Sequence, residues 1–249
     1  MKHDILSAGE IKAGAEVHIY PTLESTNDTA KTMPNASHGT LVVADTQTAG
    51  RGRHGRKFFS PPGCGIYMSI VLNPNQFPDD IFNLITPMAA VAVCEAIEDL
   101  TDKAPQIKWV NDVLLDGKKI CGILTETAAD AGGQISRIIV GIGINFTPPP
   151  SGYPPEINET TAALFTRPPI TRNQLIAEIT SRLLAGYTKD ALLTEYKKRL
   201  AILARRITII TADTTYKAIA LDIEDNCGLI IQKETGEILT LTAGEISIR

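Results

Sequence analysis

The chain has 249 residues, of which 43% are hydrophobic and 21% charged, and its formal net charge is −4. Such a composition is typical of a globular protein and provides apolar residues for one substantial core and a small second domain. The longest uncharged stretch with helical character covers residues 81–94 and includes a proline, so it is too short and too polar to cross a bilayer. Because the N-terminus carries Asp4 and Glu10 and lacks an apolar signal core, a cytoplasmic protein with no membrane partner is expected.

The cysteine pattern argues against a zinc site or a disulfide framework. The cysteines are widely spaced, form no Cys-x-x-Cys motif and have no nearby pair of histidines. We therefore predict that all of them are free thiols, most of them buried. They are Cys64, Cys94, Cys121 and Cys227.

The first part of the chain predicts strands around one short helix. Residues 18–20 indicate a short strand, and the cluster Ser25-Thr-Asn-Asp28 offers cap side chains for a helix that Pro34 ends. Apolar runs at residues 41–46 and 66–72 predict the next two strands.

The segment between these two strands, Arg51-Gly-Arg-His-Gly-Arg-Lys57, is called the basic loop below. Glycine lets the backbone approach a ligand closely, and guanidinium groups offer forked donors to phosphate or carboxylate oxygens. The four permanent charges repel one another, so we expect the loop to be mobile when empty and to order over an anion. Without these four residues the chain has 20 basic and 28 acidic residues, a balance of −8. The positive charge is therefore local, which disfavours a general nucleic-acid-binding surface.

The middle of the chain predicts a long helix followed by an antiparallel meander. Residues 79–100 have mixed helical spacing of apolar positions. Residues 106–146 alternate apolar and polar positions in runs that break at Asn111-Asp112, Asp116-Gly117 and Gly132-Gly133. These patterns predict an α+β fold with a central mixed or antiparallel sheet and helices on one face.

The last hundred residues predict three kinds of structure in turn: a loop, two helices and a group of short strands. Residues 147–155 are rich in proline and predict a mobile loop, after which residues 172–187 and 190–200 predict two amphipathic helices. Five short β-type runs then predict a small barrel. These runs are residues 206–211, 216–222, 229–233, 238–242 and 245–248, with turns at residues 212–213, 226–228 and 235–236.

Five motifs follow one another over roughly the first 150 residues. They are Glu24-Ser-Thr-Asn-Asp28, the basic loop, Lys108-Trp-Val-Asn-Asp112, the segment from Gly117 to Glu126, and Gly141-Ile-Gly-Ile-Asn-Phe146. In this order they resemble the catalytic region of the biotin protein ligases. The resemblance implies a class II synthetase-like biotinyl/lipoyl transferase core at residues 1–203 and an SH3-like β barrel at residues 204–249.

The resemblance also implies the reaction and its partners. ATP would activate biotin as biotinyl-5'-AMP with the help of Mg²⁺, and the biotinyl group would pass to a lysine of the biotin carboxyl carrier domain of a carboxylase. Since the Ser-Thr-Asn motif begins at residue 25, no room is left for a three-helix DNA-binding domain, so the chain resembles the single-function form that binds no DNA. A homodimer formed through a sheet edge is common in the family.

The site residues implied by the resemblance fall into three groups. The predicted catalytic residues are Lys119, which would contact the biotin carboxyl and the α-phosphate, Arg53, and Asp112, which would orient the incoming lysine or a Mg²⁺ ion. The predicted biotin-binding residues are Ser25, Thr26, Asn27, Gln47, Gly50, Arg51, Gly52, Arg53, Lys119 and Gly122, the last being small so that the biotin rings can pack on the strand. The predicted ATP-binding residues are Arg51, Arg53, Arg56, Phe58, Asn111, Asn145 and Arg249.

Two positions depart from the family pattern. Phe58 stands where many members have tryptophan, and Val110 replaces a common proline. Phe58 can still stack near adenine, with less area and no N–H donor. Two other functions stay open: a lipoate or octanoyl ligase, which shares the core fold but lacks the basic loop, and a nonenzymatic RNA-binding or regulatory protein that uses the loop alone.

Overall fold

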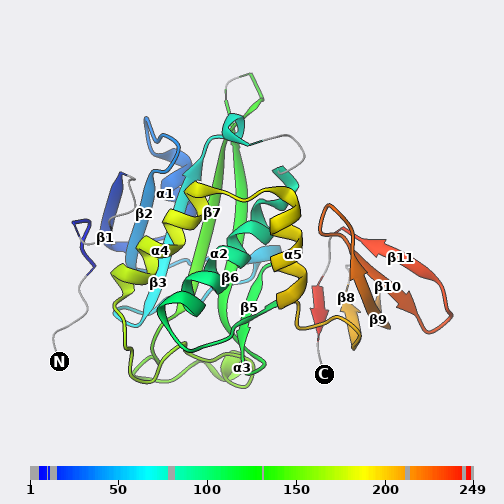
Figure 1. Cartoon of the computed structure of the whole chain (residues 1–249). Helices are drawn as coiled ribbons and strands as arrows, with labels where there is room; N and C mark the ends of the chain where they lie inside the picture. The colour runs from blue at the N-terminus through cyan, green and yellow to red at the C-terminus, as the bar shows by residue number, and fades with distance from the viewer. Residues whose placement is uncertain are drawn as a thin grey trace.

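The computed structural model describes residues 6–9, 11, 16–77, 82–130, 132–210, 214–242 and 245–247. These residues form two sheets with helices packed on the larger one (Figure 1). The larger sheet has seven strands in the order β1-β2-β3-β7-β6-β5-β4, and the smaller has five in the order β11-β10-β9-β8-β12. The predicted α+β class with a second small β unit is therefore confirmed.

The bounds of the elements follow the sequence patterns closely. The larger sheet consists of β1 (Val17–Leu23), β2 (Leu41–Gln47), β3 (Gly65–Leu72), β4 (Gln106–Lys108), β5 (Asp112–Leu115), β6 (Lys118–Ala129) and β7 (Ile135–Asn145). The helices are α1 (Thr26–Thr32), α2 (Ile85–Leu100), α3 (Pro155–Asn158), α4 (Arg172–Ala185) and α5 (Lys189–Arg199), with 3₁₀ turns η1 (Arg53–Gly55), η2 (Pro74–Gln76) and η3 (Phe82–Leu84). The smaller sheet consists of β8 (Arg206–Ile210), β9 (Thr215–Ile223), β10 (Leu229–Lys233), β11 (Ile238–Leu241) and β12 (Glu245–Ser247).

The larger sheet is mixed. β1 pairs with β2 in parallel. All the other neighbouring pairs in the order β2-β3-β7-β6-β5-β4 are antiparallel. The predicted meander is present, and β5 joins β6 through Asp116 and Gly117, whose φ angles are 51° and 76°. Positive φ at both central residues is the requirement of the tight hairpin turn that an Asp-Gly pair predicts.

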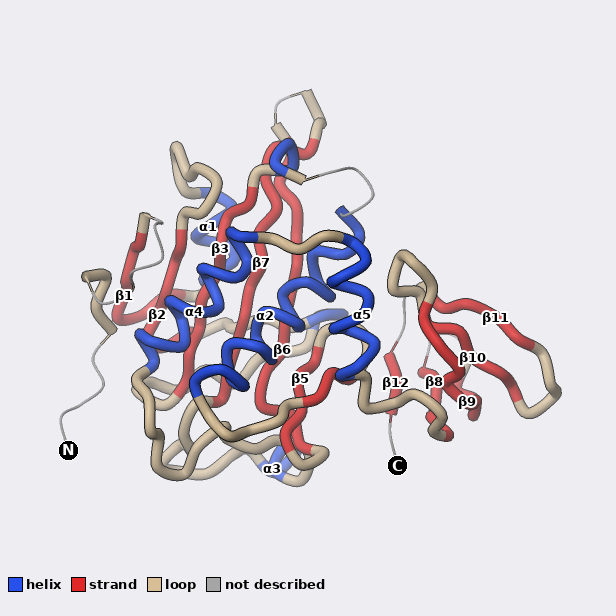
Figure 2. The backbone as a smooth tube through the Cα atoms, in the orientation of Figure 1, coloured by secondary structure: helices blue, strands red, loops and turns tan. Residues whose placement is uncertain are grey.

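The helices cover the two faces of this sheet unequally. The longer helices α2, α4 and α5 lie on one face, as predicted, and bury most of the core (Figure 2). The short helix α1 packs on the opposite face, where Ala30 belongs to a small buried cluster with Val42, Val71 and Ile139. Because successive strand residues point to opposite faces, one set of strand side chains serves the main core and the alternate set meets α1.

One predicted boundary is wrong. The helix expected at residues 79–100 begins at Ile85, preceded by η3, and residues 79–81 lie outside the described residues. Pro87 explains this start, because proline lacks a backbone N–H and fits an α-helix only in its first turn.

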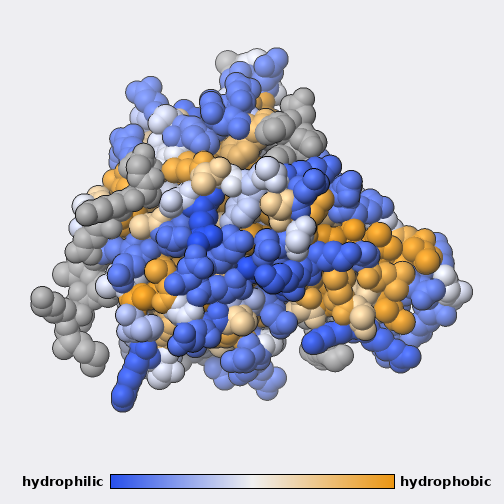
Figure 3. Space-filling view, viewed as in Figure 1, coloured by the Kyte–Doolittle hydropathy of each residue, from blue (hydrophilic) through white to orange (hydrophobic). Residues whose placement is uncertain are grey.

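The smaller sheet has the predicted number of strands at the predicted places, and it contacts the larger unit. Trp109 Nε1 donates a hydrogen bond at 2.8 Å to the carbonyl oxygen of Cys227, which lies between β9 and β10. The predicted turn at residues 212–213 and the strand ends at Thr211 and Ile248 lie outside the described residues. On the face of the molecule seen in Figure 3, hydrophobic residues gather over this sheet, whereas the helix layer is mostly hydrophilic.

All four cysteines are free and buried, as predicted. Burial raises the pKa of each thiol, to about 12 for Cys227, so these thiols stay protonated and unreactive at neutral pH. Within the described residues, no helix combines the length and the apolar character that crossing a bilayer requires.

Candidate functional site

A cavity of about 530 Å³ lies on the α1 face of the larger sheet, and Ile210 and Ile246 of the smaller sheet also line it. Residues from all five sequence motifs meet there. The predicted site residues that line it are Ser25, Thr26, Asn27, Gln47, Arg51, Gly52, Arg53, Arg56, Phe58, Asn111, Asp112, Lys119 and Gly122. Segments far apart in the sequence, from Ser25 to Ile246, therefore share one site.

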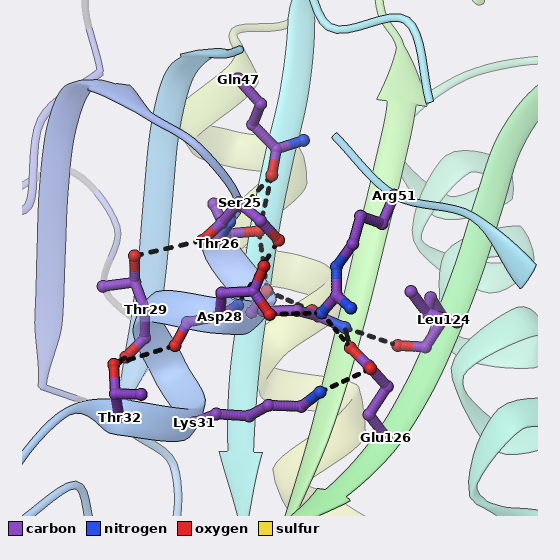
Figure 4. Close-up of polar contacts among 12 residues, drawn as sticks. Ser25, Thr26, Asp28, Thr29, Lys31, Thr32, Gln47, Arg51, Leu124 and Glu126 are labelled. Atoms are coloured by element: carbon purple, nitrogen blue, oxygen red, sulfur yellow. Dashed lines mark hydrogen bonds and ion pairs between the residues drawn. The ribbon is translucent and has the colours of Figure 1, made fainter. Parts of the chain in front are cut away.

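The N-terminus of α1 forms one wall of the cavity. Ser25 caps the helix, and its Oγ accepts from the backbone N–H of Asp28 at 3.4 Å. The backbone N–H of Thr26 donates to Gln47 Oε1 at 2.8 Å, and Gln47 Nε2 donates to Ser60 Oγ at 3.0 Å. Figure 4 shows Gln47 pointing to the start of the helix. The end of β2 is thus fixed to α1 through one amide.

Ser69 supports this wall, although the sequence interpretation gave it no role. It is fully buried in β3, and its Oγ lies 2.8 Å from Thr26 Oγ1 and 2.6 Å from Asn27 Oδ1. The signal was present in the sequence, because a serine inside an otherwise apolar buried strand must find a hydrogen-bond partner.

Asn27 is held on several sides. Its Oδ1 faces Ser69, and its Nδ2 donates to the carbonyl oxygen of Leu124 at 3.2 Å and to Glu126 Oε2 at 2.8 Å. Gly141 lies directly beneath it, where a Cβ atom would stand 2.2 Å from Asn27 Oδ1. Only glycine permits this close approach of the amide to the sheet.

Two further glycines form the floor of the cavity. Gly122 of β6 pairs with Gly143 of β7, and the Phe58 ring lies over both. A Cβ at Gly143 would stand 2.5 Å from Phe58 Cε1, and one at Gly122 would stand 3.0 Å from Lys119 Nζ. Small residues at these positions therefore leave room for the phenyl ring and for the ammonium group.

The basic loop closes on itself beside this floor. The backbone N–H of Gly52 donates to the carbonyl oxygen of Arg56 at 2.7 Å, and Arg51 and Lys57 form an antiparallel bridge. His54, with φ 53°, takes the left-handed conformation inside η1. This closed turn lets the charged side chains of one short segment line the same cavity.

Arg51 and Arg53 have polar partners outside the loop. Arg51 Nη2 donates to Asp28 Oδ1 at 2.5 Å and to Glu126 Oε2 at 2.8 Å (Figure 4). Arg53 Nη1 donates to Asn111 Oδ1 at 3.1 Å, and Asn111 in turn donates to the carbonyl oxygen of Ile123 at 2.9 Å. The carboxylate and amide partners offset the mutual repulsion of the loop charges.

Lys119 and Asp112 form an ion pair on the neighbouring strands β6 and β5. Lys119 Nζ lies 2.6 Å from Asp112 Oδ1, and the side chains are 33% and 18% exposed. The pair is half-buried and faces the cavity, so the ammonium group is held beside the glycine floor. Lys119 also bridges to Thr161, which brings residues after α3 to the cavity.

Three predicted site residues do not line the cavity in the described structure. Gly50 is buried beneath the loop, where a Cβ would stand 2.6 Å from the carbonyl oxygen of Phe58. Asn145 ends β7 and donates from Nδ2 to the carbonyl oxygen of Lys119 at 3.4 Å. Arg249 lies outside the described residues. Gly50 and Asn145 therefore support the basic loop and Lys119 from behind.

Two protein-family models match parts of this chain. The model of the biotin/lipoate A/B protein ligase family matches residues 19–145, and the model of the biotin protein ligase C terminal domain matches residues 202–249. The chain is 40% identical over 168 residues to the bifunctional ligase/repressor BirA of Bacillus subtilis, covering 64% of this chain and 51% of the relative. It is 30% identical over 242 residues to BirA of Salmonella typhimurium, covering 94% and 74%.

A solved structure with a similar fold is the biotin protein ligase of Aquifex aeolicus in complex with biotin and ATP. The TM-score is 0.79 at 28% identity, and the match covers 94% of this chain and 98% of that one. The chain spans about half the length of the Bacillus relatives that it matches. With one family model over the core and the other over the C-terminal residues, the chain belongs to the biotin protein ligases of the biotin/lipoate A/B protein ligase family.

Proposed function

We propose that the protein is an ATP-dependent ligase that converts biotin to biotinyl-5'-AMP and transfers the biotinyl group to a lysine of a biotin carboxyl carrier domain. One observation carries the proposal. The cavity joins a neutral hydrogen-bonding wall, made by Ser25, Thr26, Asn27 and Gln47, to a cationic rim, made by Arg51, Arg53 and Lys119. Biotin has a neutral ureido head and a carboxylate tail, so its two ends match these two surfaces.

In the first half-reaction, a carboxylate oxygen of biotin attacks the α-phosphorus of ATP. The bond from that phosphorus to the pyrophosphate oxygen breaks, and a mixed anhydride forms. Negative charge gathers on the phosphoryl oxygens, and preorganised cations stabilise such charge. Lys119 on the sheet and Arg53 in the basic loop supply this positive charge.

In the second half-reaction, the ε-amine of the carrier lysine attacks the biotinyl carbonyl, AMP leaves, and the amine loses a proton. Asp112 orients the incoming amine from its place beside Lys119. No group of three or more His, Cys, Asp or Glu side chains converges among the described residues. Asp112 would be the carboxylate that holds a Mg²⁺ ion, and the ion would supply charge neutralisation at the phosphates.

Phe58, Asn111 and Arg56 are proposed to meet the nucleotide. The Phe58 ring lies over Gly143 and is edge-on to Tyr67, with ring centroids 6.4 Å apart. One face of the ring is thereby supported by protein, and adenine can stack on the other.

The decisive experiment is exchange of labelled pyrophosphate into ATP in the presence of biotin, lipoate or octanoate. Biotin alone should stimulate exchange, and an added carrier domain with an unmodified lysine should then become biotinylated. Stimulation by lipoate or octanoate would instead assign the lipoate ligase function, which the first family model also covers. Absence of exchange with all three acids, together with RNA binding, would favour the nonenzymatic alternative.

A further inference from the structure

Glu126 of β6 receives hydrogen bonds from three separate positions. Its Oε1 accepts from Lys31 Nζ at 2.5 Å, and its Oε2 accepts from Asn27 Nδ2 and from Arg51 Nη2, each at 2.8 Å (Figure 4). The side chain is 20% exposed. Partial burial raises the pKa of this carboxyl, but the hydrogen bonds from Lys31 and Asn27 and the charges of Lys31 and Arg51 outweigh it and hold the pKa below its usual value.

Two of these three partners line the candidate site. The Asn27 amide has two N–H bonds, one directed at the carbonyl oxygen of Leu124 and one at Glu126. Asn27 is only 4% exposed, so loss of the carboxylate would leave a buried donor without its acceptor. Glu126 therefore fixes which way the amide points into the cavity.

The same carboxylate oxygen also orients the basic loop. The side-chain contacts of Arg51 within the described part of the chain both go through Nη2, to Glu126 and to the half-exposed Asp28. A guanidinium group is planar, so two contacts at Nη2 set its plane and direct the N–H donors of Nε and Nη1. Charged N–H donors of this kind form strong hydrogen bonds with a carboxylate or a phosphate.

We propose that Glu126 is a positioning residue for the ligase reaction, whose Oε2 orients the Asn27 amide and the Arg51 guanidinium together. It thereby couples the biotin-binding wall to the basic loop. This inference rests on the proposed function. The competing explanation is that Glu126 only fastens α1 to β6 through its ion pair with Lys31.

The two explanations can be distinguished because they involve different oxygen atoms of Glu126. Oε2 accepts from Asn27 and Arg51, whereas Oε1 accepts from Lys31. In Glu126→Gln the side chain keeps its size, but one end becomes an N–H donor. Whichever way it turns, the negative charge that pairs with Arg51 is lost, and if the N–H₂ end faces Asn27 the buried Asn27 donor also loses its acceptor. We expect the KM for biotin in adenylate formation to rise about tenfold, the effect of weakening a hydrogen bond to a charged group, with kcat within about threefold of the parent.

Lys31→Met is the matched control. It breaks the same α1–β6 ion pair but leaves both contacts of Oε2 in place, so the KM for biotin should stay within about twofold of the parent. Glu126→Asp restores an acceptor-only group on a shorter side chain and should recover part of the biotin affinity. It also keeps the test decisive if the glutamine variant does not fold, which thermal melting of each variant will show.

Several outcomes would overturn the inference. An equal rise of the KM for biotin in Lys31→Met and Glu126→Gln would show that Glu126 acts only through the ion pair with Lys31 that joins α1 to β6. A parent-like KM in Glu126→Gln, or a fall in kcat alone, would remove its link to biotin binding. A parent enzyme that shows no biotin-dependent pyrophosphate exchange would refute the proposed function itself, and is distinguishable because it appears before any substitution is made.

Discussion

Lys119 provides the most demanding test of the proposed chemistry. In the proposed mechanism, Lys119 binds the biotin carboxylate and then neutralises the negative charge that develops on the oxygens of the α-phosphate. Lys119→Gln keeps a hydrogen-bond donor and nearly the same length but removes the positive charge. A lost contact to a transition-state charge typically costs about 2.7–4 kcal/mol, or roughly 10²–10³ in rate.

The structure predicts a much smaller effect on folding stability. The Lys119–Asp112 pair is 2.6 Å long, but the lysine side chain is 33% exposed, so solvent screens the interaction. Pairs of this kind contribute about 0–1 kcal/mol, which in a chain of this length lowers Tm by at most about 4 °C. The rate of adenylate formation should therefore fall far more than the stability of the fold.

The measurement is single-turnover formation of biotinyl-adenylate at saturating biotin and ATP, with thermal melting recorded in parallel. Lys118→Gln is the control, because this exposed neighbour removes the same charge without lining the cavity. Lys119→Arg should rescue little, since a planar fork does not replace a compact ammonium between two anions. Adenylate formation by Lys119→Gln within a few-fold of the parent would refute the assignment and leave Lys119 as a partner of Asp112 alone.

Three further predictions concern the loop and the floor of the cavity. Arg53→Gly removes the donor that now meets Asn111 and should release the adenylate, so that bystander proteins become biotinylated; unchanged selectivity for the carrier lysine would contradict this. Residues 51–57 and 147–155 should gain hydrogen-exchange protection when biotin and ATP are added, and equal protection in both states would count against ordering by the ligand. Gly143→Ala places a Cβ 2.5 Å from Phe58 and should raise the KM for ATP about tenfold through overpacking, whereas Gly132→Ala, whose Cβ would meet only the Asp130 side chain at 3.3 Å, should not.

The sequence predicted most elements because their signals are local. Alternation of apolar residues and the Asp116-Gly117 pair were sufficient for the meander, and the predicted cap at Ser25 is present. The start of α2 was missed because the apolar periodicity continues past its true beginning, whereas the restriction imposed by Pro87 decides where the helix starts.

The contacts inside the site were not predictable in the same way. The three partners of Glu126 lie 95, 99 and 75 positions away in sequence, so no local pattern connects them. The motifs placed thirteen predicted residues around one cavity, but they did not distinguish residues that line it from residues such as Asn145 that support it from behind. That distinction depends on strand register, which only the folded chain defines.

The pairing of charges within the site changes how ligand binding should be understood. The charges of the basic loop were expected to repel one another, yet Arg51 of the loop is paired with Asp28 and Glu126. Lys119, on β6, is likewise paired with Asp112. An ammonium group has three N–H donors, and Asp112 occupies one of them. Two donors remain, which is the number needed to hold a carboxylate and an α-phosphate at once. In the proposed reaction, Lys119 therefore has donors for both anions without leaving Asp112, and the Asp112 carboxylate stays close enough to orient the lysine of the second half-reaction.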